Sequence, residues 1–197
     1  MSPLDPNYYL GIDAGGTSWE AMLCTSDYKI TIQEWFEGMN LRSVTNPNIP
    51  AFKVREILTE MTRMARILPY HVTNIVLAGA GVGDPIQREA ILKSCNSIIP
   101  NNPCMIVSDA DAALEGAFAG GPGIIIISGT GSIALGKDSF GKVARSGGYG
   151  YLLGDEGSGF WIGREAMRRC LDEHYSGNEI PLAKNICEKY EMEIDPK

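Results

Sequence analysis

The first forty residues contain three short stretches in which apolar and polar positions alternate, with turn-forming residues between them. These stretches are Tyr8–Asp13, Ser18–Thr25 and Lys29–Glu37. Alternation with a period of two is typical of strands that bury one face. The short connection at residues 26–28 favours antiparallel pairing of the last two. The chain therefore begins with a predicted three-stranded meander.

Beyond Pro47 and Pro50 the pattern changes to helical spacing and then to buried strands. Apolar residues recur on one stripe from Val54 to Leu68, which predicts an amphipathic helix. The next predicted elements are a strand at Asn74–Gly79, a glycine turn at residues 80–83, a helix from Asp84-Pro85 to about Asn96, a strand at Cys104–Ser108 and a helix at Asp109–Ala119. The order βββαβαβα describes an α/β, ribonuclease H-like lobe with a mixed sheet.

A second meander follows Gly120-Gly121-Pro122-Gly123, the best candidate hinge because it combines backbone freedom with a helix breaker. Its three predicted strands are Ile124–Ser128, Ser132–Gly136 and Lys142–Arg145, and the two helices predicted after them are Gly159–Tyr175 and Pro181–Tyr190. We predict two domains, residues 1–119 as the first lobe and residues 120–197 as an incomplete second lobe of the same type. A half-finished lobe leaves a sheet edge and an apolar helix face uncovered. We therefore expect either a partner that covers them, as in a homodimer, or a chain that is a fragment of a longer protein.

Composition narrows the classes of function. The 197 residues carry 17 basic against 24 acidic side chains, a net charge of −7, whereas binding to a nucleic-acid backbone requires clustered lysine and arginine. No apolar run approaches the roughly 20 residues that span a bilayer, and residues 1–7 lack the profile of a secretory signal. We expect a cytoplasmic protein without a membrane or nucleic-acid partner.

Cysteine and histidine usage points away from a structural metal site. Five cysteines occur without a C-x-x-C pair, and there are only two histidines. These numbers disfavour structural zinc, for which four such ligands must converge. Free thiols in a reducing compartment are the expected state.

Two glycine-rich turns carry the first chemical signal. Strand Tyr8–Asp13 runs into Ala14-Gly15-Gly16-Thr17, and strand Ile124–Ser128 runs into Gly129-Thr130-Gly131-Ser132. Glycines let backbone N–H groups approach an anion closely, because no Cβ obstructs them. Neither turn ends in the Gly-Lys-Ser/Thr of a Walker A loop. Two such loops indicate a phosphate chain held from two sides, although a turn with glycines present for backbone reasons is the alternative at the first loop.

Acidic residues beside these loops supply candidate chemistry. Asp13 can hold Mg²⁺ through water. Asp109 closes a strand and opens a helix, where it can take a proton from a sugar hydroxyl, although aspartate there is also a favoured N-cap. Asp111 lies inside the helix and is expected to point elsewhere. Asp155, just before another helix, can contact sugar hydroxyls or simply complement the helix dipole, and Asn40 has an amide suited to the same sugar contacts.

Together these segments resemble the superfamily of acetate kinase, heat-shock ATPases and actin. The nearest resemblance is to its N-acetylglucosamine kinase branch, grouped with BadF/BadG/BcrA/BcrD-type ATPases. Three segments carry it, Gly11–Thr17, Ile127–Ser132 and Gly147–Ser158, and the last is the most specific. The resemblance extends from Tyr8 to about Tyr175. It implies an actin-like ATPase fold and ATP-dependent phosphorylation of an amino sugar, at its 6-hydroxyl, in a cleft between two lobes.

The resemblance also implies roles for individual residues, with ATP and Mg²⁺ as cofactors. Asp109 matches the catalytic base, and Asp13 matches the magnesium position, through water. Phosphate contacts are implied at Asp13, Gly15, Gly16, Thr17, Gly129, Thr130 and Gly131, and sugar contacts at Asn40, Ser132, Gly148, Tyr149 and Asp155. Tyr149 stands where the animal enzymes carry tryptophan. The family's glycine-rich adenosine motif has no counterpart in residues 181–197, so we expect no intact adenine pocket and question the activity of the 197-residue chain.

Two other functions stay open at this point. One is an ATPase activator of a 2-hydroxyacyl-CoA dehydratase, a related class that holds an iron–sulfur cluster through cysteines at a dimer interface. The five cysteines here show no such clustering. The other is a non-catalytic sugar-binding remnant, which the missing adenosine motif favours.

Overall fold

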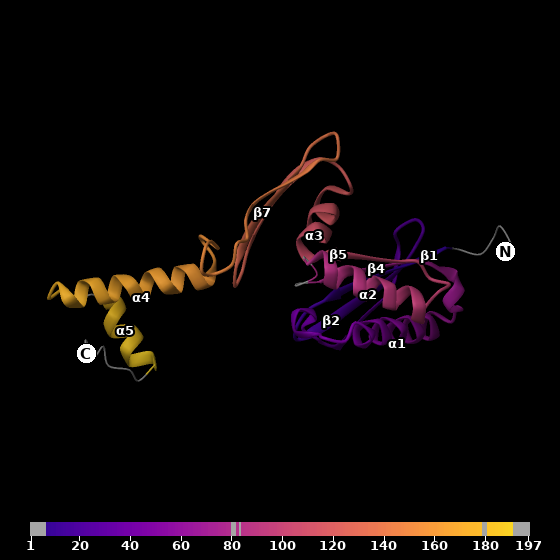
Figure 1. Ribbon diagram of the computed structural model, residues 1–197, viewed down its shortest axis with the longest axis horizontal. Helices are drawn as coiled ribbons and strands as arrows, with labels where there is room; N and C mark the ends of the chain where they lie inside the picture. Colours follow the sequence, from indigo (N-terminus) through magenta and orange to yellow (C-terminus); the bar gives the residue numbers. More distant parts are fainter. Residues whose placement is uncertain (1–6, 80–81, 83, 179–180, 191–197) are drawn as a thin grey trace. The chain divides into compact units, whose positions relative to one another are not determined.

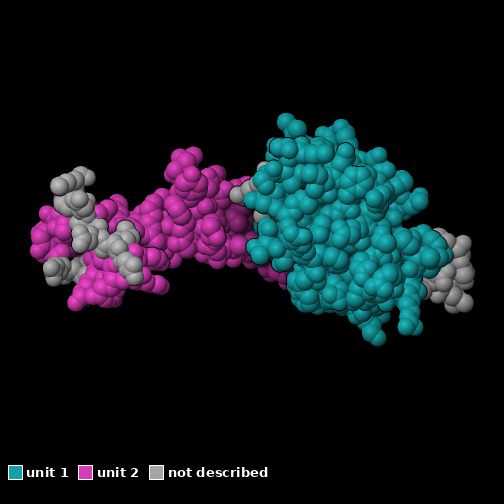
Figure 2. Space-filling model, turned by 90° about the horizontal axis from the view of Figure 1, so that it is seen from below, with its two compact units in different colours: residues 1–113 teal, residues 114–197 magenta. Residues whose placement is uncertain are grey.

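A computed structural model describes residues 7–79, 82, 84–178 and 181–190, without the side chain of residue 42. The predicted glycine turn at residues 80–83 lies outside this range except for Val82. The chain divides into two compact units, residues 1–113 and 114–197 (Figure 2). The division falls within helix α3, Asp109–Phe118, and the domain boundary after residue 119 stays a prediction. The end of α3 belongs with the following hairpin, where Lys137 Nζ donates to Glu115 Oε1 at 2.5 Å.

Unit 1 contains a five-stranded mixed sheet. Its elements are β1 Tyr8–Ala14, β2 Ser18–Thr25, β3 Ile30–Glu37, the 3-10 turn Leu41–Ser43, α1 Asn48–Ala65, the 3-10 turn Pro69–His71, β4 Val72–Gly79, α2 Pro85–Ile98 and β5 Cys104–Ser108, followed by α3. The strand order is β3-β2-β1-β4-β5. The first three strands are antiparallel, and β4 and β5 run parallel to β1. The predicted βββαβαβα order is confirmed.

The core of unit 1 lies between the sheet and the helices α1 and α2, which contact each other over one face (Figure 1). Leu10 and Ile12 of β1 point into this core with Leu77 of β4, and Ile57 of α1 packs against them. Because successive strand residues face opposite sides, Asp13 follows Ile12 onto the face away from the helices. Burial of the alternate positions therefore decides on which side Asp13 lies.

Local signals fix where α2 begins. Asp84 is its N-cap, and one carboxylate oxygen accepts from the backbone N–H of Ile86 at 2.9 Å. Pro85 occupies the first helical position, where its missing N–H is not needed. The predicted start at Asp84-Pro85 is confirmed.

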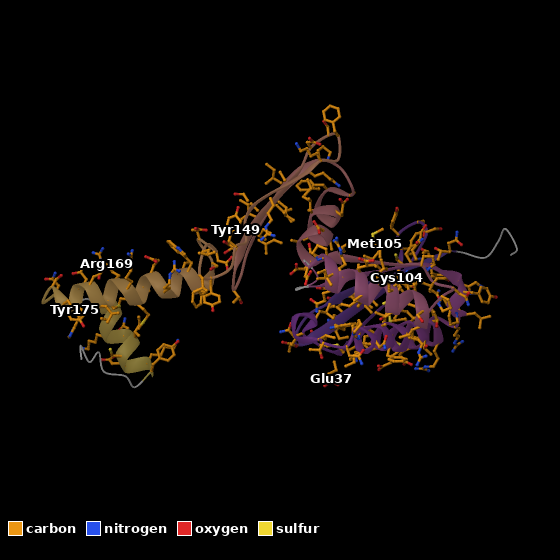
Figure 3. All side chains as sticks on the ribbon, in the orientation of Figure 1. Glu37, Cys104, Met105, Tyr149, Arg169 and Tyr175 are labelled. Carbon is orange, nitrogen blue, oxygen red and sulfur yellow. The ribbon has the colours of Figure 1, made fainter. Side chains whose placement is uncertain are left out.

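All five cysteines are free thiols, in agreement with the expectation from the sequence. Cys95 of α2 is fully buried and hydrogen-bonds the thiol of Cys104 on β5, labelled in Figure 3. That bond, together with burial, raises the pKa of Cys104 far above its ordinary value. The Cys104 thiol is consequently protonated at neutral pH, as expected of a core cysteine.

Unit 2 contains a three-stranded antiparallel sheet and two helices. Its elements are β6 Gly123–Ser128, β7 Ser132–Lys137, β8 Val143–Gly147, α4 Gly159–Tyr175 and α5 Pro181–Tyr190, with the strands in the order β6-β7-β8. The predicted second meander and both helices are confirmed, with strand ends shifted by one or two residues. Ile124 and Ile126 on the edge strand β6 are 73% and 77% exposed. Among the described helices, none combines the length and apolarity needed to cross a membrane.

Candidate functional site

The first glycine turn is held by close backbone contacts. The N–H of Gly38 donates to the carbonyl of Thr17 at 3.1 Å, and the N–H of Met39 donates to Gly15 at 3.3 Å. A Cβ at Gly38 would lie 2.2 Å from the Thr17 carbonyl carbon, and one at Gly15 would lie 2.7 Å from the oxygen of Ser18. Both positions therefore require glycine for backbone reasons. Gly38 was not singled out from the sequence, although its place just after the third strand was the available signal.

The tip of this turn stays open. Gly16 and Thr17 are exposed, as is Asp13 at the end of β1. The side chain of Asn40 lies beside the turn, since its Cβ is 3.9 Å from where a Gly16 Cβ would be. The structure thus brings Asn40 next to the predicted phosphate loop.

Asp13 and Asp109 lie at the same edge of the unit 1 sheet. Asp13 is opposite Ala78 of β4, and the next β4 residue, Gly79, is opposite Ser108, which directly precedes Asp109. Burial raises the pKa of Asp13 most, and the negative charges of Asp109 and of Glu20 raise this pKa further. The two carboxylates that the sequence predicted are therefore close enough to repel each other at the carboxyl ends of parallel strands, where α/β sheets bind ligands.

Asp109 is not the cap of α3, which corrects the structural alternative considered for it. Ser108 takes that role, because its hydroxyl accepts from the N–H of Asp111 at 3.0 Å and donates to the Asp111 carboxylate at 2.7 Å. This reciprocal pair resembles a capping box. Asp109 is exposed, and its carboxylate accepts only from the adjacent N–H of Ala110, at 2.9 Å, among the bonds of the described residues. Asp111 points back to Ser108, as expected.

The raised pKa of Asp13 gives a prediction about stability. A carboxyl group whose pKa is raised in the folded state does not lower the free energy of unfolding at low pH, where it is protonated in both states. It lowers this free energy as the pH rises through the ordinary pKa of about 4. Asp13→Asn should therefore be more stable than the parent at pH 7. The gain should be no more than about 1 kcal/mol, because the group is largely exposed and screened, and it should vanish near pH 3. Urea unfolding at the two pH values measures it, and equal midpoints at pH 7 would contradict it.

The second glycine turn, in unit 2, joins β6 and β7. Ser128 and Ser132 are opposite each other in the register and flank Gly129-Thr130-Gly131. The Ser128 hydroxyl donates to the carbonyl of Gly157 at 2.9 Å, and the Ser132 hydroxyl donates to that of Glu156 at 2.8 Å. The N–H of Gly159 donates to the carbonyl of Gly129 at 2.8 Å. The turn is thus bonded to the loop that precedes α4.

Asp155 lies in that loop and is buried, with 8% of its surface exposed. Its φ of 62° is left-handed, which is costly for a residue other than glycine. A Cβ at Gly131 would lie 2.8 Å from Asp155 Oδ2, so the carboxylate sits against the Gly131 backbone. Ser158, not Asp155, caps α4, and the first turn of α4 contains no acidic residue. The helix-dipole explanation for Asp155 is therefore not supported.

Gly148 and Tyr149 lie in the connection between β8 and α4, where Figure 3 labels Tyr149. Gly147, Gly148 and Gly150 all have left-handed φ values, of 72°, 69° and 83°. The Arg145 guanidinium donates to the carbonyl of Gly147 at 3.1 Å and also to that of Gly148. Tyr149 itself is 67% exposed, so its ring is accessible to a ligand.

The predicted residues thus fall into two groups. Unit 1 carries Asp13, Gly15, Gly16, Thr17, Asn40 and Asp109, and unit 2 carries Gly129, Thr130, Gly131, Ser132, Gly148, Tyr149 and Asp155. Among the described residues, no cluster of three or more histidine, cysteine or acidic side chains could hold a metal ion by itself. Asp13 still fits Mg²⁺, which prefers carboxylate oxygens and completes its shell with water and phosphate. Asp109 and Glu20 repel the negative charge of Asp13, and a bound cation would relieve this repulsion.

The sequence matches the BadF/BadG/BcrA/BcrD ATPase family over residues 10–178. The chain belongs to this family. It is 33% identical over 164 residues to the N-acetylmuramic acid/N-acetylglucosamine kinase of Clostridium acetobutylicum. This match covers 83% of this chain and 53% of that protein. It is 30% identical over 198 residues to the N-acetyl-D-glucosamine kinase of Dictyostelium discoideum, covering 93% and 60%. This family member thus spans a little over half the length of the curated relatives that it matches.

Solved structures agree on the fold. A proposed N-acetylglucosamine kinase from Chromobacterium violaceum has a TM-score of 0.68 at 25% identity, over 92% of this chain and 63% of that one. One from Porphyromonas gingivalis has the same TM-score at 22% identity, over 94% and 63%. The ribonuclease H-like, actin-like ATPase fold predicted from the sequence is confirmed.

Proposed function

We propose that this protein is an ATP-dependent sugar kinase. It transfers the γ-phosphoryl group of ATP to an amino sugar, N-acetylglucosamine or glucosamine, at its 6-hydroxyl. The observation that carries the proposal is the pairing of Asp13 and Asp109 at one edge of the unit 1 sheet, beside an open glycine turn. The names of the curated relatives support an amino sugar as the acceptor. The proposal extends to a cytoplasmic homodimer without a nucleic-acid partner, on the basis of composition and the exposed edge of β6.

Asp109 is the catalytic base in this proposal. Its carboxylate is exposed and free of the capping bonds, which Ser108 and Asp111 make instead. It can therefore accept the proton of the sugar hydroxyl as that oxygen attacks phosphorus, which is the base's task in phosphoryl transfer.

Asp13 would hold Mg²⁺ through water. When bound, Mg²⁺ neutralises charge on the phosphates as the transferred group leaves. The backbone N–H groups of Gly16 and Thr17 in the first turn, and those of Thr130 and Gly131 in the second, would contact phosphate oxygens. Gly15 and Gly129 would shape these turns, because their own N–H groups donate to the carbonyls of Ser18 and Gly131 at 3.1 and 2.9 Å. Sugar contacts are assigned to Asn40, Ser132, Gly148, Tyr149 and Asp155. Buried Asp155 offers a fixed acceptor, and exposed Tyr149 offers a ring face to the sugar.

A kinase assay over a panel of sugars tests the proposal. The protein is incubated with ATP and Mg²⁺ and with N-acetylglucosamine, glucosamine, N-acetylmuramic acid or glucose, and sugar phosphate is identified by mass. We expect phosphate on at least one amino sugar and, at equal concentration, at least tenfold less on glucose. Absence of every sugar phosphate, from this chain and from any longer form of the protein, would contradict it.

The same samples separate the two alternative functions. Visible absorbance after anaerobic purification, with ATP hydrolysis but no sugar phosphate, would favour an activator with an iron–sulfur cluster. The five free cysteines are dispersed over the two units, which disfavours that alternative. Calorimetry that shows N-acetylglucosamine binding without ATP binding would favour a sugar-binding remnant.

A further inference from the structure

The two loops of unit 2 are joined by more hydrogen bonds than a hairpin turn and a helix start require. A three-residue turn needs no side-chain bonds to hold its shape, and α4 already has its own cap in Ser158, whose hydroxyl accepts from Trp161 at 3.1 Å. Yet the hydroxyls of Ser128 and Ser132 both reach across to the loop before α4. These two bonds serve neither element by itself. They connect the predicted phosphate turn to the loop that carries Asp155.

The register explains why both hydroxyls reach the same loop. Ser128 and Ser132 are directly opposite each other in the β6–β7 ladder, and opposed residues of antiparallel strands project to the same face. Their targets, the carbonyls of Gly157 and Glu156, are consecutive in the chain. Ser128 and Ser132, at the two ends of the turn, therefore each bind one of two adjacent carbonyls. A third bond runs in the opposite direction, because the N–H of Gly159 donates to the carbonyl of Gly129 in the turn.

The loop that they hold contains two residues with left-handed backbone, one of which is not glycine. Asp155 and Gly157 have φ values of 62° and 77°, on either side of Glu156, whose carbonyl receives the Ser132 hydroxyl. A left-handed aspartate persists only where its surroundings over-determine the conformation. The N–H of Ser158 bonds to the Asp155 carbonyl at 3.0 Å, but that bond closes the loop only locally. The serine bonds supply the long-range restraint.

We infer that Ser128 and Ser132 are positioning residues, a hydroxyl clasp that holds the buried Asp155 carboxylate against the Gly131 backbone and makes one rigid element of the two loops. The inference rests on the proposed function in one respect, the role of Asp155 in sugar binding. Ser132 is partly buried as a residue and Ser128 is exposed, but both hydrogen bonds are open to water, so the two serines are expected to act together. Gly131 is the third part, since any side chain there would displace the carboxylate.

Amide hydrogen exchange tests the clasp without any assay of activity. In Ser132→Ala and in the double variant with Ser128→Ala, the N–H groups of Gly159 and Ser158 should exchange at least tenfold faster than in the parent. Amides of β7 that pair with β8 serve as the internal reference for global opening and should change less than threefold. Ser132→Thr, which keeps the hydroxyl, should restore slow exchange. The matched control is Ser139→Ala, an exposed serine in the β7–β8 turn. Unchanged exchange in the double variant would overturn the clasp.

Sugar kinetics test the consequence for Asp155. Because Ser132 is itself assigned a sugar contact, the test uses Ser128, which is not. Ser128→Ala should raise KM for the amino sugar up to about tenfold, the upper end for one hydrogen bond, while KM for ATP stays within twofold, and Ser128→Thr should reverse the change. Faster exchange with an unaltered sugar KM would overturn the positioning role. If the parent phosphorylates no amino sugar in the panel, the proposed function fails, and the exchange measurement still decides whether the clasp exists.

Discussion

Asp109→Asn should lower the rate of phosphoryl transfer to the amino sugar by about 10³-fold, within the range for loss of a general base. The carboxylate is exposed and makes no capping bond, so the variant should fold normally. An amide cannot take up the hydroxyl proton at neutral pH, but it can still bond to a sugar hydroxyl. Affinity for the sugar should therefore change less than threefold in calorimetry, and the loss should appear in kcat.

The neighbouring carboxylate provides a matched control. Asp111→Asn keeps an oxygen that can accept the Ser108 hydroxyl, and it leaves the backbone bond to Ser108 intact. Its turnover should remain within threefold of the parent. If Asp109→Asn keeps more than a tenth of the parental rate, or if both variants lose activity equally, Asp109 is not the base.

Gly38→Ala should destabilise unit 1 by about 3 kcal/mol, at the upper end for overpacking in a rigid environment. The new methyl group would lie 2.2 Å from the carbonyl carbon of Thr17 and 2.3 Å from the nitrogen of Ser18. These are backbone atoms of the first phosphate turn, so no side-chain rotation relieves the clash. Either β3 or the turn must move. Urea unfolding followed by amide exchange in β1 and β2 measures the loss separately from unit 2.

Gly116→Ala is the control with the opposite sign. Gly116 lies in the interior of α3, and a Cβ there meets no atom within 4 Å. Because alanine loses less backbone entropy than glycine on folding, the variant should gain about 0.5–1 kcal/mol. A Gly38→Ala protein as stable as the parent would show that the close approach of Gly38 to Thr17 is absent in solution.

Periodicity in the sequence determined most of the fold, since each element had a distinct local signal. Alternation predicted the two meanders, and the Asp84-Pro85 pair predicted the start of α2. The Asp13 and Asp109 positions were also local, because Asp13 lies at the end of one strand and Asp109 directly follows another. Parallel β1, β4 and β5 then had to bring their carboxyl ends to one edge. The candidate residues could be named for that reason without coordinates.

Tertiary structure decided what periodicity does not encode, which is how loops far apart in the chain contact each other. Only the packed turn shows that Gly38 is required by Thr17, twenty-one positions earlier in the chain. Capping of α3 by Ser108, in place of Asp109, depends on which side chain reaches the helix N–H groups. The serine bonds to residues 156 and 157 depend on a loop whose path no local propensity determines. Local patterns specify elements because they report burial along one segment, whereas contacts between loops depend on the whole packed unit.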